Sequence, residues 1–460
     1  MLSVRAIPNL IGVPYSIVLQ ISSLVDGAAQ NAETLDTLET VIWSIVVQNV
    51  NRKRGVLHRD YVQRRMDYSG ISWSTLPEHI LVTIFSYLPI SDRFHAAVVC
   101  KGWQDSFNSP YLWHSFKFSF IQPSDSIQLK FLEKYGRHLR HVEISCDQTQ
   151  QENCSQSCQV LTHLARTNER RLESIAVHFI KENPLFFRGD LFLCSLAELF
   201  GPTDPKTDVV NTLKSVILAR LAVTFEDVLL NLLADNHSTI HTLNIQNVSL
   251  TCSISSHCML NFVEKCRQLQ RLSCHYKSLS KDVFEALATP KRKPLKFLSI
   301  ACTRENKYHM EIPESSWESL VQVSPDLVVN MKFDHTIEKH RIRRILCYVI
   351  PLTQLSMTTM TELHEEVQLA ADFFHATLEK LVITTKGSPD LKRELLRLVS
   401  MSSNLKVLHC FCALDPETIS RIQVLRPQLT DTILRTAEEF EEEGRTLIGR
   451  EATSSIIMGP

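Results

Sequence analysis

Leu295-Lys296-Phe297-Leu298-Ser299-Ile300 carries the pattern that decides the fold. In this six-residue pattern, the first, fourth and sixth positions are apolar, and the second, third and fifth positions can be any residue. Alternation over the last part of this hexad is the period of a β-strand. The hexad recurs at Leu139/Val142/Ile144, Leu172/Ile175/Val177, Leu213/Val216/Leu218, Ile240/Leu243/Ile245, Leu269/Leu272/Cys274, Leu295/Leu298/Ile300, Val328/Met331/Phe333, Leu352/Leu355/Met357, Leu378/Leu381/Ile383 and Leu405/Leu408/Cys410.

The spacing of these hexads indicates a repeat array. Successive hexads begin 24 to 41 residues apart, and most intervals fall within the ~20–29 residues of a leucine-rich repeat. Amphipathic stretches with helical spacing, such as residues 282–287 and 391–399, lie between them. One strand and one helix per repeat predicts an α/β horseshoe solenoid. An irregular helical domain with incidental apolar triplets remains the alternative.

Glycine is scarce in this chain. Only 12 of 460 residues are glycine, and residues 202–386 contain none. Loops that cradle phosphates and two-residue hairpins both need glycine, so nucleotide-binding loops and a β-meander are disfavoured. The strand-to-helix turns must instead use Ser, Asn, Asp, Thr and Lys, and we expect them to be wide and irregular.

Composition excludes several classes of protein. Hydrophobic residues make up 44% and charged residues 22%, as in an ordinary globular chain, which argues against a membrane or disordered protein. Lys and Arg total 49 against 50 Asp and Glu, so no basic excess points to nucleic acid. Thirteen scattered cysteines indicate reduced thiols. The expected location is the cytoplasm, the nucleus or both.

The two ends of the chain are less informative. Residues 1–70 are interpreted as a poorly specified extension, and Met66 is a candidate alternative start. Residues 51–54, Asn-Arg-Lys-Arg, form either a solvated basic stretch or a nuclear signal. Residues 431–460 are interpreted as an acidic tail, in which Glu438–Glu443 forms a solvated run.

Residues 71–118 predict a small helical module. Ser74 or Thr75 can cap a helix that begins near Pro77, and Pro89 ends it. One apolar stripe follows that helix, at Ile80, Leu81, Ile84, Phe85 and Leu88. A module of this size cannot bury all of its apolar surface, so part of the stripe must meet the rest of the chain or a partner.

These residues resemble an F-box. The resemblance covers Leu76-Pro77, the apolar stripe, Arg93, Val99-Cys100, Trp103 and Leu112-Trp113. It implies docking onto the Skp adaptor of a Skp–cullin–F-box ubiquitin ligase. The residues expected to dock are Leu76, Pro77, Ile80, Leu81, Ile84, Phe85, Leu88, Val99, Cys100, Trp103, Leu112 and Trp113. The alternative is a three-helix domain that buries the stripe within its own chain.

Together with residues 119–430, the module resembles the F-box proteins with leucine-rich repeats, including divergent members named "F-box only". The resemblance implies a substrate receptor that has no catalytic residues and no cofactor. The Skp adaptor would connect it to a cullin–RING ligase, and the repeats would bind an unidentified target protein. A scaffold that binds Skp without directing degradation is the alternative.

Residues beside the second and third apolar positions of each hexad should face the concave side. Over these positions only Glu143, Arg271, Lys332, Asp334 and Lys380 are charged, so the face is nearly neutral and suits a protein better than a nucleic acid. Binding through end-proximal loops is the alternative. The candidate substrate face comprises His178, Asn244, Gln246, Arg271, His275, Phe297, Lys332, Lys380, His409 and Phe411.

No motif supports catalysis or a metal site. The closest zinc-like constellation is Cys146, Cys154, Cys158 and His163, in which only Cys154 and Cys158 have a usual spacing. A second cluster of thiols and imidazoles comprises Cys252, His257, Cys258, Cys266, Cys274 and His275. We expect both sets to be packed side chains and not ligands.

Overall fold

The computed structural model describes residues 76–88, 90–168, 170–181, 189–202, 213–219, 221, 223–247, 253–303, 310–359 and 361–436. The chain divides into two compact units, Met1–Ser115 and Phe116–Pro460. The extension of residues 1–70, Met66, Cys252 and the acidic run at 438–443 lie outside the described residues. Within the described ranges, no helix has the length and apolar character needed to cross a membrane.

The first unit contains the predicted helical module. The first helix of the described residues starts directly after Pro77, whose ring fixes φ at −57°, so the predicted helix start is confirmed. Three short helices and one 3-10 helix make up the described part: α3(Glu78–Ser86), α4(Ile90–Ala97), α5(Lys101–Phe107) and η3(Pro110–Trp113).

The second unit is built on one sheet whose strands lie in chain order. The ladders from β2 to β12 are all parallel. The strands are β1(Ser115–Phe120), β2(His141–Cys146), β3(Ser174–Phe179), β4(Ser215–Ile217), β5(Thr242–Asn244), β6(Arg271–His275), β7(Phe297–Cys302), β8(Val328–Phe333), β9(Leu352–Thr358), β10(Lys380–Thr384), β11(Val407–Leu414) and β12(Asp431–Thr436).

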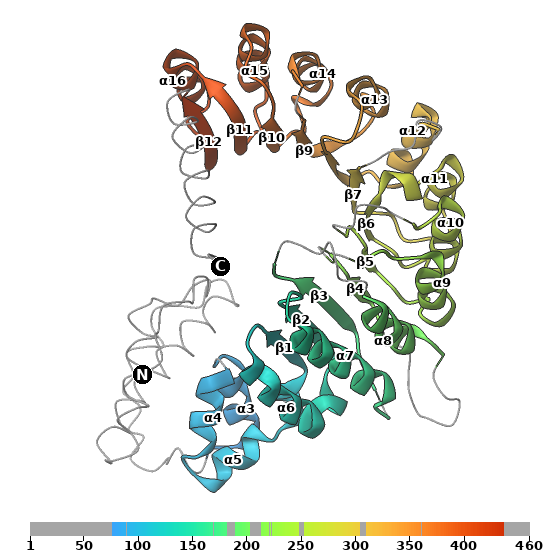
Figure 1. The fold of residues 1–460 in the computed structure, drawn as a ribbon, viewed down its shortest axis with the longest axis vertical. Helices are drawn as coiled ribbons and strands as arrows, with labels where there is room; N and C mark the ends of the chain where they lie inside the picture. Colours follow the sequence, from blue (N-terminus) through green and yellow to red (C-terminus); the bar gives the residue numbers. More distant parts are fainter. Residues whose placement is uncertain are drawn as a thin grey trace, which may run out of the picture. The chain divides into compact units, whose positions relative to one another are not determined.

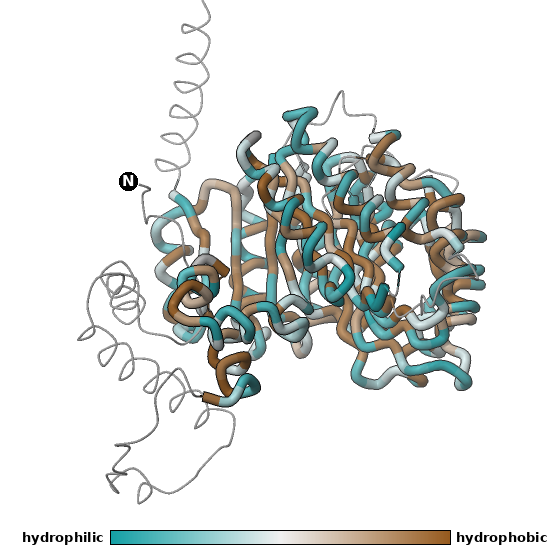
Figure 2. Tube along the Cα trace, turned by 90° about the horizontal axis from the view of Figure 1, so that it is seen from below, coloured by the Kyte–Doolittle hydropathy of each residue, from teal (hydrophilic) through white to brown (hydrophobic). Residues whose placement is uncertain are grey.

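Helices connect these strands and cover the outer side of the sheet, with the strands on the inner side (Figure 1). Along the helices hydrophobic and hydrophilic residues alternate (Figure 2), as expected where one side is buried. The helices of this unit are η4(Pro123–Ile127), α6(Gln128–Tyr135), η5(Gly136–His138), α7(Gln151–Arg166), α8(Asp190–Phe200), α9(Asp227–Asn236), α10(Ser256–Lys265), η6(Tyr276–Ser278), α11(Lys281–Leu287), α12(Glu314–Val323), α13(Lys339–Ile345), α14(His364–Phe374), α15(Pro389–Met401) and α16(Pro416–Leu425).

The structure confirms the predicted strand and helix of each repeat. It corrects the predicted alignment of the hexads between β7 and β8. From β2 to β7 the second apolar positions pair with one another, ending with Leu272 opposite Leu298. At β8, Leu298 pairs with Val329, and the predicted second position Met331 pairs with Ile300. Because the step is two residues, Met331 and Phe333 keep their face of the sheet. Val328, predicted as the first apolar position, is instead the register partner of Phe297 and 37% exposed, and Leu327 is buried in its place.

The array is also longer at both ends than the hexads predict. Strand β1 precedes the first hexad, and Phe116, Phe118 and Phe120 alternate along it and are buried. Strand β12 lies within the segment interpreted as an acidic tail, so the repeats extend to Thr436. The expected boundary between the module and the repeats, at residue 118, falls inside β1, whereas the two units divide after Ser115.

Short polar side chains form the turns that lead into helices, as expected for a glycine-poor chain. Ser255, Ser280, Ser388 and Asp415 each accept a hydrogen bond from a backbone N–H in the first turn of α10, α11, α15 and α16. Each such cap contributes about 1 kcal/mol. Gly189, which precedes α8, is the described glycine with a positive φ, at 72°.

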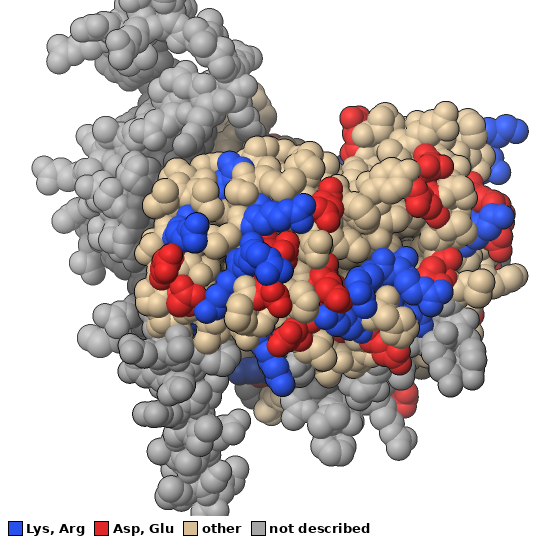
Figure 3. Space-filling view, turned by 90° about the horizontal axis from the view of Figure 1, so that it is seen from above, with Lys and Arg blue, Asp and Glu red and all other residues tan. Residues whose placement is uncertain are grey.

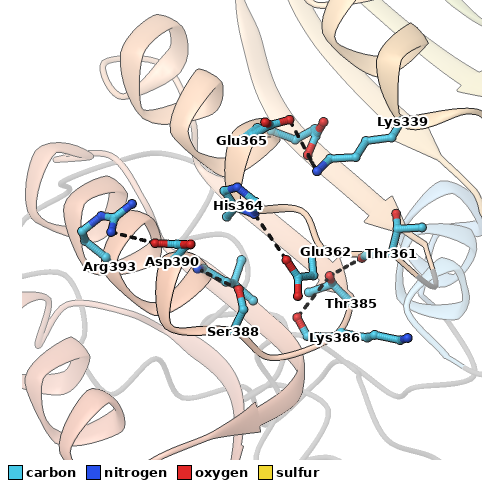
Figure 4. A network of polar contacts seen from close by, with 12 residues as sticks. Lys339, Thr361, Glu362, His364, Glu365, Thr385, Lys386, Ser388, Asp390 and Arg393 are labelled. Carbon is cyan, nitrogen blue, oxygen red and sulfur yellow. Dashed lines mark hydrogen bonds and ion pairs between the residues drawn. The ribbon is translucent and has the colours of Figure 1, made fainter.

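The turns after β9 and β10 share one polar network (Figure 4). The Thr385 hydroxyl donates to the Thr361 carbonyl at 2.6 Å, which links the two turns. Ser388 caps α15 by accepting from the backbone N–H of Leu391 at 3.2 Å, and Arg393 pairs with Asp390 at 2.7 Å. Side-chain contacts therefore fix the turn after β9 without glycine, whereas the turn after β10 contains Gly387, where an added Cβ would lie 2.8 Å from the Ala413 carbonyl oxygen.

Ion pairs connect neighbouring helices on the outer side. Lys and Arg are interleaved with Asp and Glu in the view of Figure 3. Arg343 of α13 pairs with Glu365 of α14 at 2.7 Å, and Arg397 of α15 pairs with Asp372 of α14 at 2.5 Å. Exposed pairs of this kind contribute at most ~1 kcal/mol each, so the apolar core carries most of the stability.

Candidate functional site

Arg93 holds the first module together. Its guanidinium donates to the carbonyls of Leu88 and Leu112, both at 2.9 Å, and of Ser86 at 3.2 Å. These acceptors lie at the end of α3 and in η3, so one side chain of α4 ties both to its own helix. The arginine of the sequence motif therefore has a structural role.

An aromatic cluster forms the core of the module. Trp113 is fully buried, and its indole N–H donates to the Phe107 carbonyl at 2.8 Å. The rings of Phe107 and Trp113 meet edge to face with centroids 4.9 Å apart, and those of Phe85 and Trp103 do so at 5.4 Å. Contacts with this geometry add to the stabilisation from burial alone.

This packing corrects part of the predicted docking set. Leu81, Ile84, Phe85, Trp103, Leu112 and Trp113 are buried, so they support the module and do not present their side chains to a partner. The sequence motif could not separate the two roles, because the apolar stripe is wider than the part of α3 that the module covers.

The rest of the predicted docking set is at the surface. Ile80 is 40% exposed and Val99 is 50% exposed. Pro77 is exposed, and Leu76, Leu88 and Cys100 are half-buried. Sequence reasoning missed Phe94, Val98 and Tyr111, which are also exposed. A small module that leaves this much apolar surface in water is expected to cover it with a partner.

The predicted substrate face is largely accessible. Arg271 and Lys332 are exposed, and His178, Asn244, Gln246, Phe297, Lys380, His409 and Phe411 are half-buried. Two contacts order its central part. The Arg271 guanidinium lies 4.2 Å from the centroid of the Phe297 ring, and the Gln246 side-chain amide donates to the Ser299 carbonyl at 2.9 Å.

His275 is the exception on this face. It is 4% exposed, with Nε2 3.0 Å from the Asn247 side-chain oxygen and Nδ1 3.3 Å from the Thr303 hydroxyl. Burial lowers the pKa of this imidazole to about 4. The neutral ring is thus part of the sheet's internal polar structure, and His275 is corrected from a candidate substrate contact to a structural residue.

We expect His275 to make stability depend on pH. In the unfolded chain the imidazole takes up a proton near its ordinary pKa of 6.5, while the buried ring with a pKa of about 4 stays neutral. The contribution to folding stability is therefore complete above pH 6.5 and is lost as the pH falls through 4, and amounts to about 3 kcal/mol. Nearby Asp334 opposes the shift but does not cancel it.

Thermal unfolding of the wild type and of His275→Gln, from about pH 7 to pH 4.5, measures this effect. The wild-type Tm should fall more steeply towards acid. His237, a second buried histidine with a pKa lowered to about 4, is present in both proteins and cancels in the comparison. Parallel Tm curves would contradict the assignment of a neutral, buried His275.

Two further side-chain contacts lie at the C-terminal end of the strand face. His409 of β11 and Asp431 of β12 lie 2.9 Å apart, and the Arg435 guanidinium lies 6.0 Å from the Phe411 ring. Asp431 and Arg435 were missed because β12 was not predicted. Apolar and polar residues do not alternate along β12, in which only the adjacent Ile433 and Leu434 are strongly apolar.

Most thiols of the two clusters pack in the interior, as expected, whereas Cys158 is half-buried and His257 is exposed. The described cysteines are free thiols. Cys146 of β2 forms a side-chain hydrogen bond with Cys154 of α7, which lowers the pKa of Cys146 and raises that of Cys154. Cys258, Cys266 and Cys274 are buried between repeats. Over the residues that the structure describes, no three His, Cys, Asp or Glu side chains are arranged to hold a metal ion.

Comparison with known proteins agrees with both parts of this architecture. A family model described as F-box-like matches residues 73–119. The chain is 26% identical over 374 residues to F-box/LRR-repeat protein 8 of Homo sapiens, covering 81% of this chain and 98% of that protein. It is 29% identical over 276 residues to F-box/LRR-repeat protein 21 of Mus musculus, covering 57% of this chain and 60% of that protein.

The matched segment coincides with the helical module, and the longer similarity runs on through the parallel repeats. The chain therefore carries an F-box-like segment and is similar over most of its length to F-box/LRR-repeat proteins.

Proposed function

We propose that this chain is a substrate receptor of a Skp–cullin–F-box ubiquitin ligase. Its first module would dock onto the Skp adaptor, and its repeats would bind a target protein. The observation that carries the proposal is the F-box-like segment at residues 73–119, followed by a long strand face built from parallel repeats.

The exposed apolar residues of the module support the docking step. Ile80, Val98 and Val99 cost free energy when they are left in water, and a partner that covers them recovers it. Arg93 and the aromatic cluster fix the helices, so this surface is preorganised and little conformational entropy is lost on binding.

The strand face supports target binding. It is nearly neutral, with Lys117 of β1 paired to Glu143 of β2 at 2.6 Å, and it combines polar side chains with Phe297 and Phe411. Such a mixture suits a protein surface. The receptor needs no catalysis of its own, because holding a target beside a charged conjugating enzyme raises the effective concentration of its lysines.

Proximity labelling in cells under proteasome blockade tests the proposal, with the wild type compared with Ile80→Asp. A true target should be labelled by both proteins, because the repeats are unchanged, but should accumulate ubiquitin only with the wild type. Labelled proteins whose ubiquitination and lifetime are equal in the two cell lines would contradict the receptor function and favour a non-degradative scaffold. The same tagged chain would test the expected location in cytoplasm or nucleus.

A further inference from the structure

A cluster of basic side chains without acidic partners among the described residues lies on the side of the repeat sheet where the strands begin. The cluster lies where the chain enters β6 and β7 from the preceding helices. We name it the basic edge, and all of its side chains are exposed: Arg267, Arg271, Lys291, Lys293 and Lys296.

The backbone brings these residues together. The N–H of Lys293 donates to the Arg267 carbonyl at 3.1 Å, and the N–H of Lys296 donates to the Gln270 carbonyl at 2.8 Å. Arg271 is the register partner of Phe297, the residue after Lys296. Five positive charges therefore lie within two adjacent repeats, whose strands are ~4.8 Å apart.

A buried arginine fixes the loop that displays two of the lysines. Arg292 is 7% exposed, and its guanidinium donates to the carbonyls of Val263 at 3.1 Å and of Ala286 and Cys266 at 3.4 Å. These carbonyls lie at or near the ends of α10 and α11. Because Arg292 points inward, its neighbours Lys291 and Lys293 are held facing solvent on a loop with little freedom.

Equivalent positions elsewhere on the same edge are charge-paired. Before β3, Glu173 pairs with Lys214 at 2.7 Å and with Arg140 at 3.6 Å. Before β10 and β11, Glu379 pairs with Lys406 at 3.1 Å. None of the five residues of the basic edge forms an ion pair with a carboxylate in the part of the chain that the structure describes.

Two acidic residues border the cluster without neutralising it. Glu264 lies at the end of α10, where its backbone carbonyl accepts from the Arg267 guanidinium at 3.4 Å. Asp326 lies in the turn before β8, beyond Lys296, and is exposed. Five positive groups against these two leave a local positive excess in a chain whose net charge is −1.

We propose that the basic edge binds an acidic segment of a target protein, an inference that rests on the proposed receptor function for the identity of its partner. Arg271 is stacked on Phe297 and so presents its guanidinium in a fixed orientation, which suits bidentate binding of a carboxylate or phosphate group. The lysines add charge that steers an anionic segment to this place.

The size of the cluster favours a peptide over a nucleic acid. Nucleic-acid binding draws on many phosphate contacts along an extended basic surface. Here the net charge of the whole chain is −1, and the five basic side chains lie within two adjacent repeats. A short run of Asp, Glu or phosphorylated Ser residues matches the small extent of this basic cluster.

The test uses the full-length chain and labelled peptides. One variant reverses the edge with Lys291→Glu, Lys293→Glu and Lys296→Glu. A matched control carries Lys130→Glu, Lys134→Glu and Lys386→Glu, which change three exposed lysines elsewhere and alter the net charge equally. The probes are a peptide of alternating glutamate and serine, the same peptide with phosphoserine, and a glutamine version.

The wild type and the control should bind the glutamate or phosphoserine peptide, and raised salt should weaken binding. The edge variant should bind at least about tenfold more weakly, and the glutamine peptide should not bind. Comparing the two anionic peptides separates carboxylate from phosphate as the preferred group. Equal binding by edge variant and control, no binding by the wild type, or stronger binding of single-stranded RNA than of either peptide would overturn the proposal.

Titration of the same proteins with the Skp adaptor keeps the two proposals separate. The edge variant should bind the adaptor like the wild type, because its substitutions lie in the second unit. If the wild type binds anionic peptides but not the adaptor, the receptor function fails while the anionic site stands. If it binds the adaptor but no peptide, the basic edge alone fails.

Discussion

Ile80→Asp is expected to weaken binding of the Skp adaptor by more than about thirtyfold, or ~2 kcal/mol. Ile80 is 40% exposed on α3, so a partner that covers it would bury an unpaired carboxylate in the variant. The fold should be unaffected, because the side chain is not part of the aromatic core. Calorimetric titration of the purified chain with the adaptor gives the affinity, and a thermal scan gives the Tm.

Val424→Asp is the matched control for this substitution. Val424 lies on α16 in the second unit and is 80% exposed, and the change again replaces an aliphatic side chain with aspartate. Both variants should keep the wild-type Tm, and only Ile80→Asp should lose the adaptor. Equal affinity for the two variants would mean that Ile80 is not at the docking surface.

Trp113→Ala is expected to unfold the first module while the repeats stay folded. The substitution removes a fully buried ring, its hydrogen bond to the Phe107 carbonyl and its contact with the Phe107 ring. Loss of such a side chain costs about 3–5 kcal/mol, which is comparable to the whole stability of a domain this small. Hydrogen exchange followed by mass spectrometry can report each unit separately.

In that experiment, peptides from α3 to η3 should lose protection in the variant, and peptides from β6 to β9 should keep it. Tyr111→Ala, two residues away in the same 3-10 helix and exposed, is the control and should change stability by less than ~0.5 kcal/mol. Loss of protection across both units would show that they fold as one. Unchanged exchange in the module would contradict the role given to Trp113.

The repeats could be predicted because each strand is buried on one side and follows a period of two. The ten hexads mark ten of the strands, and the two-residue step at Val329 leaves Met331 and Phe333 on their predicted face. Strand β1 could have been found from the alternation of Phe116, Phe118 and Phe120. Strand β12 lacks that signal, and only its pairing with β11 reveals it.

The candidate sites were harder to predict, because exposure depends on neighbours that are distant in the sequence. Ile80 and Leu81 are adjacent apolar residues on one helix, yet the first is exposed and the second is buried against the module. His275 occupies a position that should face the concave side, but its ring is buried and contacts the side chains of Asn247 and Thr303 from neighbouring repeats. The spacing of residues within one segment cannot predict contacts with residues from other repeats.

The basic edge illustrates the same limit. Lys291, Arg292 and Lys293 form one short basic run in the sequence, but only the structure separates the inward arginine from the outward lysines. Their nearness to Arg267 and Arg271 follows from the parallel register of β6 and β7.

Co-elution of the purified full-length chain with the Skp adaptor and the adaptor-binding domain of a cullin tests the central claim most directly. The proposed receptor function predicts one complex that contains the three proteins in equal amounts, and Ile80→Asp should leave the chain outside it. Elution of the wild-type chain separate from the adaptor and the cullin, at concentrations where those two associate, would contradict that function.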